Sequence, residues 1–245
     1  MQTALRSILA LLAGWLIAVS NTTPTSAAQL IINGGFETGG FAGWTVADQA
    51  GGSGSFFVTG AATTPLSGFA TVGPRSGTFY AVSDQTGPGT HALIQSFIVP
   101  VGSSSVILSF DMFVNDQSGV GPIVNPAGLD FNAFPNQHAR VDILTATATP
   151  FATGAGVLAN FYLGIDAGTS PHPYTSYLFD ITPLVGAGGT FQLRFAEVDN
   201  QFFFNQGVDN VGIMASGVPE PMSLLLLGSG LAGLAAVALR QHHRV

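Results

Sequence analysis

The chain has 245 residues, lacks cysteine and lysine, and carries a formal net charge of −7 at pH 7. Between residues 29 and 217 the only Lys or Arg residues are Arg75, Arg140 and Arg194, whereas all but one of the 13 acidic residues lie there. Such an acidic surface repels phosphate backbones, which excludes nucleic-acid binding. The absence of cysteine excludes disulfide bonds, thiol catalysis and thiolate metal sites.

The first 28 residues have the organisation of a secretory signal peptide. Arg6 gives a weakly positive start, the run Ile8–Val19 is apolar, and Ser26-Ala27-Ala28 supplies small residues for signal peptidase. We therefore expect export and cleavage before Gln29, which leaves residues 29–217 as one domain of ordinary size. A retained first membrane helix is the alternative.

Residues 29–217 show the pattern of an all-β domain. Short β-branched and aromatic runs alternate with Gly, Pro, Asn and Ser, and no helical periodicity of any length is present. In the clearest run, Val106–Val114, every second residue is apolar, while Ser109 and Asp111 occupy the other face. The further expected strands are Leu30–Ile32, Trp44–Val46, Ser55–Val58, Phe79–Ser83, Leu93–Val99, Val141–Ile143, Tyr177–Ile181, Phe191–Phe195 and Gly207–Met214.

About ten short strands without the spacing of βαβ units predict a β-sandwich of two sheets, of the jelly-roll type. The stretches Val114–Gln137 and Thr145–Pro173 are rich in Pro and Gly and are expected to be loops, where binding sites often form. Alternation places Arg140, Asp142 and Arg194 on the face opposite the apolar residues of their strands.

Two separated motifs mark the beginning and the end of this domain. Asn33-Gly-Gly-Phe-Glu37, followed by Trp44, opens it, and Gly207-Val-Asp-Asn-Val211 closes it, with Leu93-x-Gln95-x-Phe97 between them. Together they resemble the galactose-binding-like jelly roll shared by many carbohydrate-binding modules. The resemblance implies that the two motifs meet around a structural calcium with Glu37 and Asp209 as side-chain ligands, and Ca²⁺ favours such oxygen ligands.

A capped turn or a salt bridge is the alternative role for Glu37 and Asp209. The two glycines of the first motif are expected to supply positive φ angles in a tight turn. Trp44 is expected in the core of the domain.

The sequence offers little support for catalysis. Glycoside hydrolysis needs two carboxylates flanking a cleft, and the candidate pair is Glu197 with Asp199, which can share a strand face but is typical of exposed acidic pairs. His91, His138 and His172 are scattered, no Gly-x-Ser-x-Gly elbow occurs, and no His spacing is typical of zinc. We therefore expect no enzymatic activity.

Glycan binding needs aromatic faces beside polar side chains. Tyr174 and Tyr177 lie near junctions of loops and strands and are the expected stacking residues. The alternative surface is the segment of three phenylalanines between amides, Phe202–Phe204. As a strand or bulge edge this segment would bury its first and third rings, whereas as a loop it would bind a partner or matrix polymer.

The end of the chain consists of three parts. Val218-Pro219-Glu220-Pro221 is followed by Met222–Leu239, which carries no charge, and by the basic tail Arg240–Val245. At 1.5 Å per residue the apolar segment would span about 27 Å, close to the thickness of a bilayer core. The basic tail favours a cytoplasmic carboxyl terminus, with the domain outside the membrane. A buried core helix is the alternative.

This order of motif, apolar helix and basic end resembles the PEP-CTERM sorting signal of Gram-negative bacteria. The resemblance implies that a membrane-embedded exosortase recognises Pro219, Glu220 and Pro221, and that the helix is a temporary membrane anchor before transfer to the cell surface or release. It also implies an association with exopolysaccharide and biofilm. We therefore expect an exported structural or adhesive protein. The alternative is a carbohydrate-binding module that recognises a glycan, and a glycoside hydrolase is a distant third.

Overall fold

The structure is a computed structural model that describes residues 27–217. The predicted signal peptide, apart from its last two residues, lies outside the described residues, as do the sorting motif Val218–Pro221 and the predicted membrane helix 222–239. Within residues 27–217, no helix is both long enough and apolar enough to cross a membrane.

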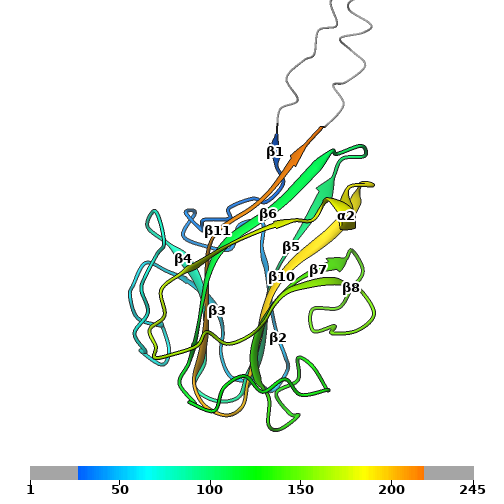
Figure 1. The fold of residues 1–245 in the computed structure, drawn as a ribbon. Helices are drawn as coiled ribbons and strands as arrows, with labels where there is room; N and C mark the ends of the chain where they lie inside the picture. Colours follow the sequence, from blue (N-terminus) through cyan, green and yellow to red (C-terminus); the bar gives the residue numbers. More distant parts are fainter. Residues whose placement is uncertain (1–26, 218–245) are drawn as a thin grey trace, which may run out of the picture.

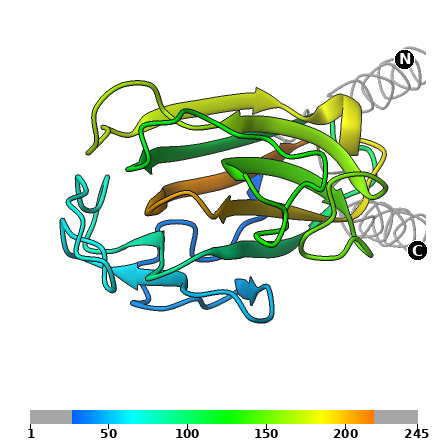
Figure 2. The ribbon, with the colours of Figure 1, turned by 90° about the horizontal axis from the view of Figure 1, so that it is seen from below.

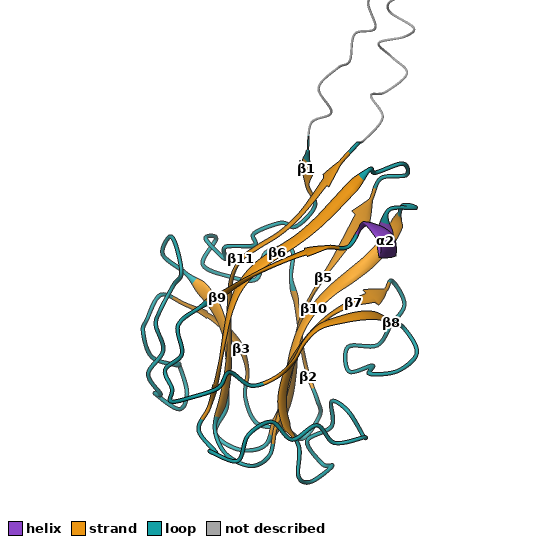
Figure 3. Ribbon diagram, viewed as in Figure 1, coloured by secondary structure: helices purple, strands orange, loops and turns teal. Residues whose placement is uncertain are grey.

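In the described region, eleven strands form two antiparallel sheets that pack face to face (Figures 1 and 3). Sheet 1 has the order β3-β4-β11-β6-β9, with β1 paired to β11, and sheet 2 has the order β2-β5-β10-β7-β8. The predicted all-β sandwich of two sheets is therefore confirmed. The elements are β1 (Ala28–Gln29), β2 (Thr45–Asp48), β3 (Ser55–Thr59), β4 (Tyr80–Asp84), β5 (Gly89–Val99), β6 (Ser105–Asp116), β7 (Gln137–Thr145), β8 (Val157–Gly164), β9 (Thr175–Asp180), α2 (Thr182–Val185), β10 (Gly189–Asp199) and β11 (Phe204–Ser216).

The strand β8 lies inside the stretch Thr145–Pro173, so the prediction of one continuous loop there was wrong. This strand forms the edge of sheet 2, and most of its residues are half-buried or exposed on both faces. Because neither face is fully buried, the sequence has no regular alternation of apolar and polar residues that would indicate a strand.

The first strand lies two residues earlier than expected. Ala28 and Gln29 pair with β11, whereas Leu30–Ile32 does not form a strand. The Gln29 side chain takes over the next positions of the ladder, because its Oε1 accepts hydrogen bonds from the backbone N–H of Ile31 at 3.0 Å and of Ile213 at 2.9 Å. The chain therefore leaves the sheet earlier than its β-branched residues indicate.

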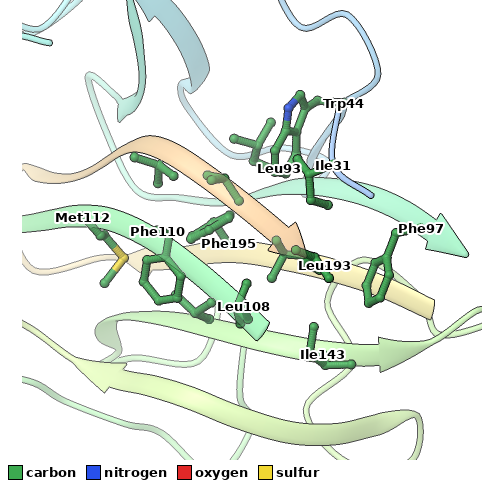
Figure 4. Packing of buried hydrophobic residues seen from close by; sticks show 14 of the residues in the cluster. Ile31, Trp44, Leu93, Phe97, Leu108, Phe110, Met112, Ile143, Leu193 and Phe195 are labelled. Carbon is green, nitrogen blue, oxygen red and sulfur yellow. The ribbon is translucent and has the colours of Figure 1, made fainter. Parts of the chain in front are cut away.

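The core between the sheets is built largely of aromatic rings. Phe110 of β6 and Phe195 of β10 face each other with centroids 5.2 Å apart and ring planes at 85° (Figure 4), an edge-to-face geometry that aromatic pairs favour. Trp44 packs against Phe195 and Phe36 at centroid distances of 6.2 and 5.6 Å. Trp44 is 7% exposed, which confirms its expected place in the core.

The outer face of sheet 2 carries a buried cluster of charges. Arg140 and Arg194 both pair with Asp142, and Arg140 donates to the two carboxylate oxygens at 2.7 and 2.8 Å. Arg194 also donates to the carbonyl oxygens of Pro150 and Ala152, at 2.7 and 2.8 Å. The loop between β7 and β8 therefore contacts this cluster through Arg194, on a face that alternation alone would leave in water.

Candidate functional site

The interior of the sandwich becomes polar at one end. In β10 the inward-facing apolar residues up to Phe195 are followed, with the same two-residue period, by Glu197 and Asp199. In the neighbouring strand β5, His91 follows Leu93 towards the same end and lies directly opposite Glu197. The turns β4–β5 and β10–β11 close this end, which is at the bottom of Figure 1.

His91, Glu197 and Asp199 form a compact buried group. One ligand-type atom from each residue lies within 4.8 Å of the others. The Nδ1 atom of His91 is 2.8 Å from Oδ1 of Asp48, and its Nε2 atom is 3.0 Å from the carbonyl oxygen of Ser53 and 3.9 Å from Oε1 of Glu197. Imidazole nitrogen and carboxylate oxygen are common metal ligands, so this group can hold a metal ion.

The two carboxyl groups of this cluster are held in an unfavourable environment for negative charge. Glu197 is 0% exposed, and neither of its carboxylate oxygens has a hydrogen-bond partner among the described residues. Burial raises the pKa of Glu197 well above its ordinary value, and the charge of Asp199 acts in the same direction. Burial also raises the pKa of Asp199 to about 8, although the N–H of Gly89 donates to its Oδ1 at 3.1 Å and opposes this effect. Such a pair favours binding of protons or of a cation.

A pocket of about 250 Å³ opens onto this cluster from outside. It lies between the β4–β5 turn, residues 85–88, and the segment 199–203, which comprises the last residue of β10 and the β10–β11 turn. Asp199 belongs both to the pocket wall and to the buried cluster. The wall also contains the side chains of Gln85, Asn200 and Gln201. The pocket therefore connects the polar interior with the surface.

Two of the three consecutive phenylalanines line this pocket. Phe202 is 51% exposed, Phe203 is half-buried, and Phe204 is buried at the start of β11. The alternation expected for a strand, with the first ring buried and the second exposed, was therefore wrong, because the first two rings lie in a turn. The rings of Phe202 and Phe203 lie nearly perpendicular, with centroids 5.0 Å apart, and Phe203 also packs against Phe69 at 5.0 Å.

Glu37 and Asp209 both bind the loop that precedes β4. Oδ2 of Asp209 accepts hydrogen bonds from the backbone N–H of Arg75 and Ser76 at 2.9 and 3.1 Å. Oε1 of Glu37 accepts from the N–H of Thr78 at 2.9 Å and of the following residue at 3.1 Å. The structure thus brings the two carboxylates to one loop, in the manner of the capped-turn alternative. Calcium binding by this pair stays a prediction.

The loop that these carboxylates bind belongs to the long segment between β3 and β4, which lies beside one edge of sheet 1 (cyan in Figures 1 and 2). The guanidinium of Arg75 pairs with Asp111 at 3.8 Å rather than with Asp209. Burial raises the pKa of Asp209, while the three backbone N–H groups that donate to it act in the opposite direction. Both motif carboxylates therefore anchor this segment to the sandwich.

Replacing Asp209 with alanine is expected to lower the free energy of unfolding by about 1–3 kcal/mol, because the backbone N–H groups of the loop lose a charged acceptor in partly buried hydrogen bonds. The loss should appear in thermal unfolding of the full chain in detergent, both with chelator and with millimolar Ca²⁺. A rise in the melting temperature of the wild type with Ca²⁺ that Asp209→Ala abolishes would establish the calcium site. No rise with Ca²⁺ would contradict it and leave the hydrogen-bonding role alone.

The glycines of the first motif have a different role from the expected one. Asn33 and Phe36 have the positive φ angles of the motif, 53° and 57°, whereas Gly34 and Gly35 do not have φ in that range. Asparagine tolerates this conformation better than most residues. Gly34 instead lies where a Cβ atom would be 1.9 Å from the carbonyl oxygen of Val211. The glycine is needed there for close approach of two backbones.

Tyr174 and Tyr177 do not form a common aromatic surface. Tyr174 packs on the outer face of sheet 1 against Phe113, with ring centroids 5.0 Å apart, and its hydroxyl donates to the carbonyl oxygen of Gly73 at 3.0 Å. Tyr177 lies on the inner face and stacks on Phe110 at 4.8 Å. Burial raises the pKa of both hydroxyl groups. Their role as stacking residues for a ligand stays a prediction.

Sequence reasoning identified the pair Glu197 and Asp199 but not its partner His91. The spacing of two along β10 indicates a shared face, whereas the approach of His91 depends on the register between β5 and β10. A pattern within one strand carries no information on that register. The sequence signal that could have pointed to His91 is its two-residue spacing from Leu93 in an apolar strand.

No protein-family model and no curated protein matches the chain. Among solved structures, the enzymatically active domain of tailspike protein 4 of bacteriophage CBA120 has a TM-score of 0.46 and 10% identity, over 76% of this chain and 21% of that chain. TmCBM61 in complex with β-1,4-galactotriose has a TM-score of 0.45 and 11% identity, over 76% and 98%. CBM4 has a TM-score of 0.40 and 19% identity, over 76% and 99%. Each of these similarities covers 76% of this chain and concerns the arrangement of the backbone alone.

Proposed function

We propose that residues 29–217 form an exported, non-enzymatic module that binds carbohydrate or adheres to an extracellular polymer, with the pocket between the β4–β5 and β10–β11 turns as its ligand site. The observation that carries the proposal is the composition of this pocket. The exposed ring of Phe202 lies beside Asp199, Asn200 and Gln201. Sugars are commonly bound by an aromatic face together with amide and carboxylate groups that bond their hydroxyls.

The place of the pocket in the domain supports this role. β11 begins one residue after the pocket segment and runs for 13 residues to Ser216. At about 3.3 Å per residue the pocket is roughly 40 Å from the end of the domain. The predicted membrane helix 222–239 follows that end. In the proposed arrangement the pocket therefore points away from the membrane, towards polymers outside the cell.

Export and processing belong to the same proposal and are supported by the sequence of the two chain ends. Signal peptidase would remove residues 1–28, the helix 222–239 would anchor the domain outside the cytoplasmic membrane, and exosortase would act at Pro219–Pro221. The resemblance to PEP-CTERM proteins makes exopolysaccharide the favoured polymer. In this proposal a calcium ion at Glu37 and Asp209 would be structural, since both hold a loop.

The burial of Glu197 supports a role without catalysis. A hydrolytic carboxyl group has to reach the glycosidic bond of its substrate, and Glu197 is 0% exposed. Glu197 and Asp199 also lie side by side on one strand rather than across a cleft. The expected result is that incubation with polysaccharide releases no reducing ends.

The test of the proposed site is binding of the full chain, purified in detergent, to a panel of neutral and acidic polysaccharides by affinity electrophoresis. We expect saturable retardation by at least one polysaccharide, and about tenfold weaker binding for Phe202→Ala, since loss of one stacking ring costs about 1.4 kcal/mol. Val101→Ala is the matched control, because Val101 is 75% exposed in the β5–β6 turn at the other end of the sandwich. Equal weakening by both substitutions, or no retardation by any polysaccharide, would contradict the proposal.

A further inference from the structure

Glu197 is a buried carboxyl group that makes no hydrogen bond among the described residues, although the hydroxyl of Ser83 lies close enough to lower its pKa. Asp84, at the same end of the sandwich and also 0% exposed, accepts hydrogen bonds from the N–H of Ser67 at 2.8 Å, from the N–H of Gln85 at 3.0 Å and from Nδ2 of Asn205 at 3.2 Å. Both oxygens of Glu197 lack such partners among the described residues. An unpaired carboxylate in the interior costs folding free energy, so we expect Glu197 to bind a proton or a cation.

His91 is oriented as a metal-binding histidine would be. Its Nδ1 atom lies 2.8 Å from the carboxylate of Asp48, so a single ring proton on Nδ1 would leave the lone pair on Nε2 for a metal ion. This nitrogen faces the carbonyl oxygen of Ser53 at 3.0 Å and Oε1 of Glu197 at 3.9 Å. With a lone pair on Nε2, His91 would have two further electron-rich oxygen atoms beside this nitrogen, and a cation bound there would offset their repulsion.

The side-chain amide of Gln85 lies close to Asp199, whose pKa it lowers. Gln85 lines the pocket together with Asp199, and neither the oxygen nor the nitrogen of its buried amide has a hydrogen-bond partner among the described residues. One carboxylate oxygen of Asp199 accepts the N–H of Gly89, which leaves the other for a ligand. The cluster is therefore more than a group of acids, since it combines an oriented imidazole, two carboxylates and an unpartnered amide.

We infer that His91, Glu197 and Asp199 bind a divalent transition-metal ion inside the sandwich, with the amide oxygen of Gln85 as a further ligand. Zn²⁺ and Mn²⁺ accept mixed nitrogen and oxygen ligands, whereas Ca²⁺ takes oxygen ligands. Zinc ligands lie about 2.0–2.2 Å from the ion, so atoms within 4.8 Å of one another need only small side-chain movements to share it. Asp199 reaches the pocket and marks the route by which the ion enters.

A doubly protonated His91 is the competing arrangement. An imidazolium ring would donate to Asp48 and to the carbonyl oxygen of Ser53, and its charge would offset that of Glu197. This arrangement needs no metal and predicts no specific effect of one. The two arrangements are therefore distinguished by metal titration.

The experiment is thermal unfolding of the full chain in detergent, after treatment with chelator and its removal, with added Zn²⁺, Mn²⁺ or Ca²⁺. At about 100 times the dissociation constant, Zn²⁺ should raise the melting temperature by roughly 5–10 °C. Ca²⁺ at the same concentration should give no increase that depends on Glu197. Glu197→Gln, which has nearly the same shape and no charge, should remove the shift without lowering the metal-free melting temperature. Asp199→Asn is the second variant, in case the first does not fold.

Two controls separate this site from other effects. His242→Ala/His243→Ala removes the two histidines of the basic tail and should keep the full shift. Phe202→Ala should also keep it while weakening polysaccharide binding, so failure of the glycan proposal would not imply failure of the metal site. No shift with Zn²⁺ or Mn²⁺, or an equal shift in Glu197→Gln and the wild type, would overturn the inference in favour of the imidazolium arrangement.

Discussion

The Asp142→Asn protein is expected to lose about 3–5 kcal/mol of unfolding free energy, the usual cost of removing one partner from a buried ion pair. Asparagine keeps the shape of the side chain but leaves the guanidinium groups of Arg140 and Arg194, 7% and 0% exposed, without a counter-charge. For a domain of this size the melting temperature should fall by roughly 6–20 °C. Thermal unfolding of the full chain, followed by circular dichroism in detergent, measures this effect.

The loop between β7 and β8 should loosen in the same variant. Arg194 donates both to Asp142 and to the carbonyl oxygens of Pro150 and Ala152. Without Asp142 we expect the guanidinium to be less well ordered, and therefore faster proteolysis within residues 145–156. Asp180→Asn is the control, because it makes the same chemical change at an exposed position of the edge strand β9. A loss below about 1 kcal/mol for Asp142→Asn would mean that water already reaches the cluster.

The same cluster shows how far alternation predicts a fold. The two-residue alternation of apolar and polar residues correctly separated the two faces of β6 and of β10, since one face of each strand packs in the core. It also placed Asp142 and Arg194 on the face away from the core. Their burial could not be predicted, because it depends on tertiary contacts such as those of Arg194 with the β7–β8 loop.

The candidate site was predictable to a similar extent. The two-residue spacing of Glu197 and Asp199 indicated a shared face, but an acidic pair in a sequence is ordinarily exposed. In the structure, the face of β10 that packs in the core also includes the positions after Phe195. The same alternation therefore places both carboxyl groups in the interior. The approach of His91 then follows from strand register. Local sequence patterns thus predict which residues share a face of a strand. Burial and contacts across strands depend on tertiary packing.

The Gly34→Ala protein is expected to lose about 3 kcal/mol or more of unfolding free energy, the upper part of the usual range for overpacking. The added Cβ would lie 1.9 Å from the carbonyl oxygen of Val211, and the N–H of Val211 donates to the carbonyl oxygen of Gly34 at 2.9 Å. Both groups are backbone, so no side chain can move aside to relieve the contact. The motif would have to separate from β11, and chemical denaturation of the full chain would measure the cost.

Gly40→Ala is the matched control for this effect. A Cβ at Gly40 meets no atom within 4 Å, and its φ lies outside the positive range, so alanine should be accommodated with little change in stability. A general effect of removing glycine from the unfolded chain would act equally at both positions. A large difference between the two variants therefore measures the close contact between the first motif and the last strand. If the two variants are equally stable, Gly34 does not approach Val211 so closely, and the joining of the two motifs around Glu37 and Asp209 would need another explanation.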